Sequence, residues 1–417
     1  MGTEETKDCP SLRRDLEPIP VMREGQQAVA LRDPQELSPG TLILGRQEAF
    51  FVALMDGERT VLDLQEAFMR RFGELVFSES IQRLIEQLDR QFLLENDRYL
   101  ERMSEEIKRF QQADVRRSSL AGLSYDADPG KLKDTLNSYF VDGGEGDANE
   151  DEETQGGDLL GIVAPHIDLG RGGVCYARAH KVLAEEASSE SVFLILGTAH
   201  MPGERPVILT RKDFETPLGK LPTDKDLVDE LLDLLPFDAL EDEYLHRREH
   251  SVEFQVLFLQ NGFPKEEPKI LPVLVGPFDE DHTGTSRTVG ELEAFVEVLQ
   301  QVMRKGKRLV LIASADLSHL GPRFGNERAL NAAELAQVEV MDRAMLGTVA
   351  SGEASLFRQD MLSSHQERNV CGYPSIYCLL SLLSEVQFRG DLLDYKQCVD
   401  PQTGDMVSIA SMAFRAA

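Results

Sequence analysis

Three histidines in this chain lie where a metal site forms in α/β proteins. His166, His200 and His319 each come shortly after a run rich in Val, Ile and Leu, which is typical of a buried β-strand. The three runs cover residues 159–164, 191–196 and 308–313. Ligands of open α/β sheets bind beyond the carboxyl ends of the strands, and imidazole is the commonest ligand of first-row metals. We therefore expect one shared metal site, although each histidine alone could be a hydrogen-bonded structural residue.

A cysteine and an aspartate add further donors to this group. Cys371 opens an apolar segment, residues 371–383, that is predicted to be a helix. The unpaired N–H groups at a helix start lower the pKa of a thiol, so Cys371 is a candidate soft ligand or nucleophile. Asp316 precedes His319 in the same strand-end segment and could assist as a ligand or as part of an acid–base pair. Cys378, seven residues after Cys371, is interpreted as a core residue.

Glu249 and His250 form another polar cluster, together with Ser251 and Glu253, ahead of an apparently amphipathic segment at 254–259. Glu249 and His250 are candidate catalytic residues for proton transfer. The alternative is a helix N-terminal cap with a solvated face. The remaining histidines are expected to be structural or on the surface. They are His180, His246, His282 and His365.

Composition excludes several classes of function. The formal net charge is -29, so the surface would repel a phosphate backbone and nucleic-acid binding is not expected. No apolar run reaches the ~20 residues that span a bilayer, and the start of the chain lacks the apolar core of a secretory signal. Five cysteines at irregular spacing favour a reducing compartment, which predicts a cytoplasmic protein. The sequence lacks Walker, GxGxxG-after-strand, HExxH and GxSxG signatures.

The first 110 residues are predicted to differ in character from the rest. Residues 1–40 contain five prolines and predict an extended lead-in with one strand at 27–32. Residues 41–110 predict a small helical domain, in which Thr60 to Asp63 has the pattern of a capping box. A short hairpin expected at 93–100 would complete a winged-helix outline.

Residues 115–417 predict an α/β domain with a mixed, mostly parallel sheet and helices on both faces. Apolar strands alternate with helices at 174–187, 288–304 and 371–383, and two terminal strands are expected at 392–399 and 406–415. Residues 142–158 carry acidic and no basic side chains. Such a segment cannot bury a core, so we expect a flexible loop that interrupts the domain.

Segments of this domain resemble, in the correct order, the Memo family, the B component of the group called AmmeMemoRadiSam. The segments are RSSLAGLSY at 117–125, LGIVAPH at 160–166, ILGTAH at 195–200, TPLG at 216–219, EHS at 249–251, ILPVLVG at 270–276, SADLSHLG at 314–321 and VCG at 370–372. The resemblance implies a fold related to class III extradiol dioxygenases, which are non-haem iron enzymes. It also implies that His166, His200 and Cys371 bind iron or copper, with Asp316 and His319 close by.

The chain departs from the family pattern beside three of these positions. His166 is followed by Ile167-Asp168-Leu169, the residue after His200 is Met201, and Cys371-Gly372 is followed by Tyr373. The walls of the pocket therefore differ, and the substrate could differ with them. Asp168 is a candidate for an additional carboxylate.

These observations favour a metal-binding protein with redox or oxygenase-like activity. The alternative is a binding module, because the pattern DGERTVLDLQEAF…IQRLIEQLDRQFLL within 41–110 resembles PqqD-type peptide-binding modules. In that case the N-terminal unit would present a peptide to a radical-SAM partner, and the pocket would be a vestigial enzyme site that recognises a peptide end. A ring-cleaving dioxygenase acting on a small molecule is the third and least favoured hypothesis.

Overall fold

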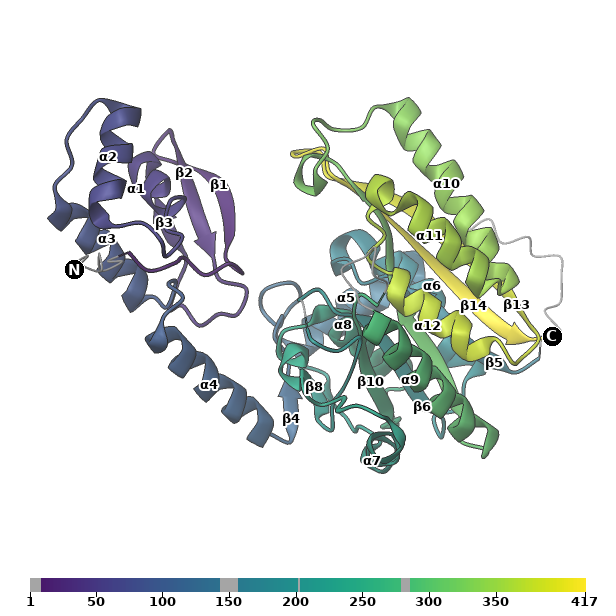
Figure 1. Ribbon diagram of the computed structural model, residues 1–417. Coiled ribbons are helices and arrows are strands. Elements are labelled where there is room, and N and C mark those ends of the chain that lie inside the picture. Colours follow the sequence, from purple (N-terminus) through teal and green to yellow (C-terminus); the bar gives the residue numbers. More distant parts are fainter. Residues whose placement is uncertain (1–8, 143–156, 202, 279–285) are drawn as a thin grey trace. The chain divides into compact units, whose positions relative to one another are not determined.

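The computed structural model describes residues 9–142, 157–201, 203–278 and 286–417. The chain divides into two compact units, unit 1 (Met1–Gln112) and unit 2 (Ala113–Ala417). Each unit has its own hydrophobic core. The two units are therefore described separately (Figure 1).

Unit 1 combines a three-stranded antiparallel sheet with four helices. The sheet has the order β1 (Glu17–Arg23), β2 (Gln26–Arg32), β3 (Leu42–Leu44). The helices are α1 (Arg46–Val52), α2 (Val61–Phe72), α3 (Ser78–Arg90) and α4 (Asp97–Gln112). The predicted lead-in with one strand was thus incomplete, because residues 17–23 form a second strand there. Pro18 and Pro20 are tolerated in β1 because it is an edge strand.

Two local predictions for unit 1 have opposite outcomes. The capping box is confirmed, since the Thr60 side chain accepts a hydrogen bond from the amide of Asp63, and the Asp63 carboxylate accepts one from the amide of Thr60. The hairpin at 93–100 is wrong. The Asn96 side chain accepts a hydrogen bond from the amide of Tyr99 and so caps α4, while Leu94 forms a β-bridge with Leu12. The Asn-Asp pair therefore starts a helix instead of a turn.

Unit 2 is built on an eight-stranded mixed sheet, and the predicted α/β fold class is confirmed. The order is β12-β14-β5-β11-β6-β10-β7, with β13 paired to β14. The four central strands are parallel, and the flanking strands pair antiparallel. The strands are β5 (Leu159–Ala164), β6 (Val192–Thr198), β7 (Val207–Leu209), β10 (Ile270–Val275), β11 (Leu309–Ser314), β12 (Asp316–Leu320), β13 (Phe388–Val399) and β14 (Met406–Ala416). A small separate sheet contains β4 (Val115–Arg117), β8 (Asp213–Thr216) and β9 (Gly219–Leu221).

Helices cover both faces of the large sheet (Figure 1). Alternate residues of the central strands enter two separate hydrophobic clusters, as expected for a sheet that is buried on both sides. One face carries α5 (Pro129–Asp142), α6 (Leu169–Glu186) and α8 (His250–Gly262). The other carries α7 (Lys225–Leu234), α9 (Ser286–Arg304), α10 (Ala332–Ser351), α11 (Ala354–Arg368) and α12 (Tyr373–Leu383).

Three features of unit 2 differ from the sequence prediction. Helix α6 begins at Leu169, earlier than expected, because the Asp168 side chain accepts a hydrogen bond from the amide of Arg171 and caps it. Residues 251–259 of α8 are buried on every side, so the segment is not amphipathic. The third concerns His319, which lies in a strand, β12, and not in a loop. The acidic segment at 142–158 falls mostly outside the described residues.

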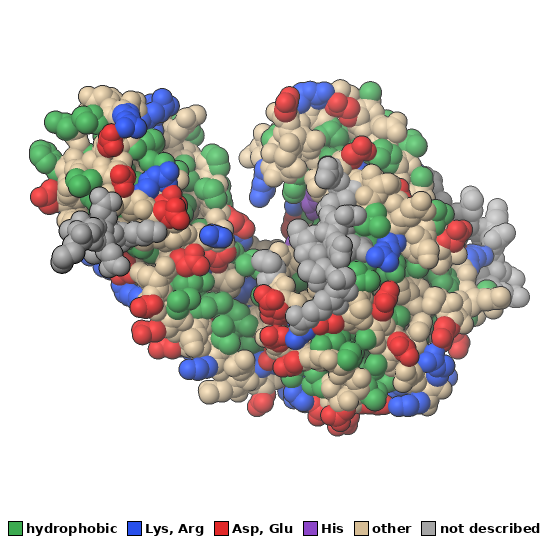
Figure 2. Space-filling view, viewed as in Figure 1, with side chains coloured by type: hydrophobic (Ala, Val, Ile, Leu, Met, Phe, Trp, Pro, Cys, Tyr) green, Lys and Arg blue, Asp and Glu red, His purple; other side chains and the backbone are tan. Residues whose placement is uncertain are grey.

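The surface and the helices are consistent with the composition. On the face drawn in Figure 2, acidic and basic side chains are interspersed, without a large continuous basic area among the described residues. Within the described ranges, no helix is both long enough and apolar enough to traverse a bilayer.

Candidate metal centre

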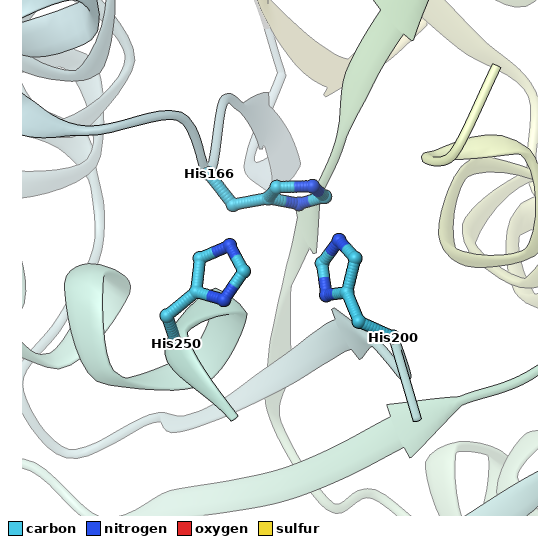
Figure 3. A group of neighbouring side chains, drawn as sticks. All are labelled: His166, His200 and His250. Atoms are coloured by element: carbon cyan, nitrogen blue, oxygen red, sulfur yellow. The ribbon is translucent and has the colours of Figure 1, made fainter. Parts of the chain in front are cut away.

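Two of the three predicted histidines, His166 and His200, meet at one edge of the large sheet, and the third imidazole there belongs to His250 and not to His319. β5, β11 and β6 are neighbours in the sheet and run parallel, so their carboxyl ends lie together. His166 follows β5 and His200 follows β6, while Asp316 comes just after β11. His250, the first residue of α8, faces the same space (Figure 3).

Three imidazoles are close enough to share one ion. One nitrogen from each of His166, His200 and His250 can be chosen so that all three lie within 4.8 Å of one another. The ring centroids of His166 and His200 are 5.0 Å apart, and those of His200 and His250 are 4.6 Å apart. The described side chains thus contain a three-histidine group with the geometry to hold a metal ion.

His166 is held in one orientation by the end of β11. Its side chain is buried, and Nδ1 lies 3.0 Å from the carbonyl oxygen of Ser314. A carbonyl can only accept, so Nδ1 donates its proton to Ser314, and Nε2 is the nitrogen that faces Cys371. The amide of His166 donates to Oδ1 of Asp316 at 2.7 Å. Asp316 therefore fixes the backbone at His166, and its Oδ2 lies 3.8 Å from Nε2.

Glu249 orients the other two imidazoles. Its carboxylate oxygens lie 3.0 and 3.1 Å from Nδ1 of His200, and Oε1 lies 3.2 Å from Nδ1 of His250. The amides of His200 and Ser251 also donate to this carboxylate, at 3.0 Å each. Burial would raise the pKa of Glu249, but the charges of His200 and His250 hold it well below the usual range. A carboxylate with its oxygens engaged in this way is suited to positioning the histidines.

The thiol of Cys371 joins the same group. Its Sγ lies 3.2 Å from Nε2 of His166, so the thiol and this imidazole are in direct contact. Although burial acts in the opposite direction, the charges of His166 and His319 and hydrogen bonds from His166 and His200 hold the pKa of Cys371 well below its ordinary value. The thiolate is the form that binds metals.

Gly372 allows this close placement of Cys371. A Cβ at this position would lie 2.4 Å from the Cβ of Ala315 and 2.5 Å from the carbonyl oxygen of Asp316. The start of α12 therefore packs directly against the segment between β11 and β12. The amide of Gly372 donates to Asp316 across this contact.

His319 also contacts the thiol of Cys371. Its Nδ1 is 2.9 Å from the carbonyl oxygen of Leu317, which leaves Nε2 for the hydrogen bond to Cys371. Burial lowers the pKa of His319, but the charge and hydrogen bond of the Cys371 thiolate raise it to about 9. The ring packs edge-on against Phe324 at a centroid distance of 5.1 Å. His319 can therefore carry a proton beside the thiol.

Other predictions for this region are resolved as follows. Asp168 forms an ion pair with Arg171 and caps α6. His180 and His246 are buried and hydrogen-bonded to Gln255 and to the backbone of Ile208, as expected of structural histidines. Cys378 is buried in the core, and burial raises its pKa to about 12. His282 and the side chain of His365 lie outside the described part.

Comparison with known proteins agrees with this geometry. The model of the family described as Memo-like protein matches residues 116–413, most of the chain. The chain belongs to the Memo-like family. Its relatives include a MEMO1 family protein of Methanosarcina acetivorans, 31% identical over 72% of this chain and 98% of the relative. Another, from Thermus thermophilus, is 29% identical over 72% of this chain and 82% of the relative.

One relative extends beyond the Memo-like region. A MEMO1 family protein of Aquifex aeolicus is 28% identical over 385 residues, which is 92% of this chain and 95% of the relative. This match is longer than the whole of unit 2 and therefore reaches into unit 1. The combination of both units thus occurs in a second member of the Memo-like family.

Proposed function

We propose that this Memo-like protein binds one iron or copper ion at His166, His200 and Cys371. The observation that supports this proposal best is the fixed orientation of both imidazoles: Nδ1 of each contacts an oxygen acceptor, which leaves Nε2 to face the thiol. Metal-binding histidines typically have such acceptors behind them. His250 offers a further nitrogen within reach of both other imidazoles.

The donor set suits redox-active metals. Imidazole with thiolate favours copper and iron over the hard cations magnesium and calcium. The bound ion would supply one-electron transfer or oxygen chemistry, and the proposed activity is oxidoreductase or oxygenase-like. His319 and Asp316 would hold or transfer a proton beside the metal, because His319 is hydrogen-bonded to the thiol and Oδ2 of Asp316 lies 3.8 Å from Nε2 of His166.

Metal analysis of protein purified without oxygen tests this proposal. We expect about one equivalent of iron or copper in the wild-type protein, and at least tenfold weaker binding in His166→Ala and Cys371→Ala. Cys378→Ala is the matched control, because it removes a buried thiol from α12 that does not belong to the site. Unchanged metal content in both site variants, or wild-type protein that binds neither metal, would overturn the proposal.

A second candidate function concerns unit 1, as a peptide-binding module of the PqqD type acting with a radical-SAM partner. Unit 1 has a pocket of about 440 Å³ between the β1–β2 hairpin and α1, lined mainly by apolar groups including Pro20, Val29 and Ala49. Met22, also in the lining, is 67% exposed. Co-purification of a radical-SAM enzyme with the full chain, abolished by Met22→Glu and retained in Met69→Glu on α2, would support this function. Equal capture by both variants would contradict it.

A further inference from the structure

Arg116 lies at the start of unit 2 and is almost fully buried, with a side chain that is 1% exposed. Its guanidinium makes polar contacts in three directions. Nε donates to the carbonyl of His246 at 2.9 Å, and Nη2 donates to the carbonyl of Glu249 at 2.9 Å. Nη1 forms an ion pair with Glu253. The planar fork of an arginine thus holds two backbone carbonyls and one carboxylate at once.

The counter-ion Glu253 is equally well satisfied. Its carboxylate accepts hydrogen bonds from the amides of Ser119 and Leu120 at 3.0 and 3.1 Å, and from the hydroxyl of Tyr125. Burial of such an ion pair costs free energy, and well-packed apolar residues of similar volume often stabilise a fold as much as the ion pair does. A contribution to the stability of the fold therefore does not by itself explain why Arg116 and Glu253 are buried here. The distinguishing property of this network is that it fixes the main chain just ahead of α8.

This fixed main chain carries the residue that orients the metal-site imidazoles. The carbonyl held by Arg116 belongs to Glu249, whose carboxylate contacts Nδ1 of His200 and His250. Two residues further on, the hydroxyl of Ser251 donates to the carbonyl of Thr198 at 3.0 Å and ties α8 to the end of β6. A shift of the chain at Glu249 would therefore move the acceptor behind both imidazoles.

We propose that Arg116, with Glu253 as its counter-ion, is a positioning residue for the metal centre that acts through Glu249. The expected effect on metal affinity rests on the proposed metal-binding function. The expected effect on the orientation of the imidazoles does not, because it can be measured in the metal-free protein. Loss of outer partners of metal-bound histidines typically weakens metal binding 10- to 100-fold. We expect an effect of that size when the guanidinium fork is lost.

Arg116→Lys tests the proposal, because lysine keeps the charge but cannot hold two carbonyls and a carboxylate in one plane. Arg117→Lys is the matched control, since the neighbouring side chain is 87% exposed. In the metal-free protein, NMR of the imidazole groups should show a protected Nδ1–H on His200 in the wild type and control. Arg116→Lys should broaden or shift this signal, and its dissociation constant for Cu(I) or Fe(II) should rise 10- to 100-fold.

The outcomes separate the two proposals. A folded Arg116→Lys with the imidazole signals and metal affinity of the control would overturn the positioning role. If wild-type protein binds no metal but Arg116→Lys still changes the His200 signal, the positioning role stands and the proposed function fails. Should Arg116→Lys not fold, Ser119→Ala removes one partner from each member of the pair. It should give a smaller shift in the same direction, and an unchanged His200 signal would count against the proposal.

Discussion

At the scale of single residues, Glu249 links several groups of the candidate metal centre. Its carboxylate contacts two imidazoles and two backbone amides. Sequence analysis identified Glu249 and His250 as candidate catalytic residues. The contacts favour an orienting role for Glu249 and give His250 a place among the nitrogen donors.

Glu249→Gln should therefore weaken metal binding while the protein stays folded. Glutamine keeps the shape but removes the charge, and its amide nitrogen cannot accept from an imidazole N–H. We expect a 10- to 100-fold higher dissociation constant, measured by competition with a chelator. The exposed Glu185→Gln should behave as wild type. Equal affinity in both variants would contradict an orienting role.

His180 gives a prediction for the pH dependence of stability. Burial lowers the pKa of His180 from 6.5 to about 4, although the hydrogen bond with Gln255 acts to raise it. The unfolded chain therefore takes up a proton at higher pH than the folded protein does. The stabilisation from the neutral ring is complete above pH 6.5 and is lost as the pH falls towards about 4.

The variant His180→Phe isolates this contribution. It keeps a ring against Phe258 but removes the hydrogen bond from His180 to Oε1 of Gln255, at a cost of roughly 1–3 kcal/mol at high pH. Urea unfolding across the pH window should give a shallower decline of the free energy of unfolding than in wild type. Parallel curves for the two proteins would rule out the titration of His180 as a cause.

Single residues of the site could be predicted only in part. The ligand candidates were visible because rare histidines follow apolar runs. The partners behind them, Ser314 and Arg116, were not, because a backbone carbonyl has no sequence signature and an arginine near a strand is usually solvated. The EHS segment was the available signal for His250. Its interpretation as a cap was correct, since Glu249 caps α8, but the expected solvated face was wrong, because Ser251 and Glu253 are buried.

At the scale of elements, the start of α12 determines where the thiol lies. Gly372→Ala should destabilise the protein by roughly 1–3 kcal/mol, because the added methyl would overlap Ala315 and the carbonyl of Asp316. The displaced helix start should also weaken metal binding. Gly290→Ala in α9 is the matched control, since nothing lies within 4 Å of its added methyl. That variant should be unchanged or slightly more stable, by about 0.5–1 kcal/mol.

Thermal unfolding together with metal titration checks this prediction. If Gly372→Ala matches Gly290→Ala in both stability and affinity, the close packing of α12 against the β11–β12 segment does not position the thiol. If stability falls while affinity is retained, the packing supports the fold but not the site.

The ends of the central strands were predicted to within two residues. These strands are apolar on both faces, and such a continuous apolar run is visible in the sequence whichever helices pack against it. Elements that depend on tertiary partners were harder to predict. The prolines of β1 argued against a strand, although an edge strand tolerates them. The start of α8 is polar, which suggested a solvated face, but these polar residues lie at the metal centre. Residues 93–100 show that Asn-Asp can equally start a helix or form a turn.

For the whole molecule, metal binding should stabilise only one of the two units. The core of unit 1 and the two cores of unit 2 share no residues, and all of the candidate ligands are in unit 2. We expect two transitions in calorimetry, of which one shifts with added metal. At a free ligand concentration of 100 times the dissociation constant, the shift corresponds to about 2.7 kcal/mol. A single transition that shifts as a whole with added metal would show that the units unfold together.

X-ray absorption spectroscopy at the metal edge of anaerobically loaded protein tests the central claim most directly. The account predicts at least two imidazole nitrogens at ~2.0–2.1 Å and one sulfur at ~2.3 Å from the ion, by analogy with other first-row sites. The sulfur should disappear in Cys371→Ala and remain in Cys378→Ala. A metal without a sulfur neighbour in the wild-type protein, or one that keeps its imidazoles in His166→Ala, would contradict the assignment of the site.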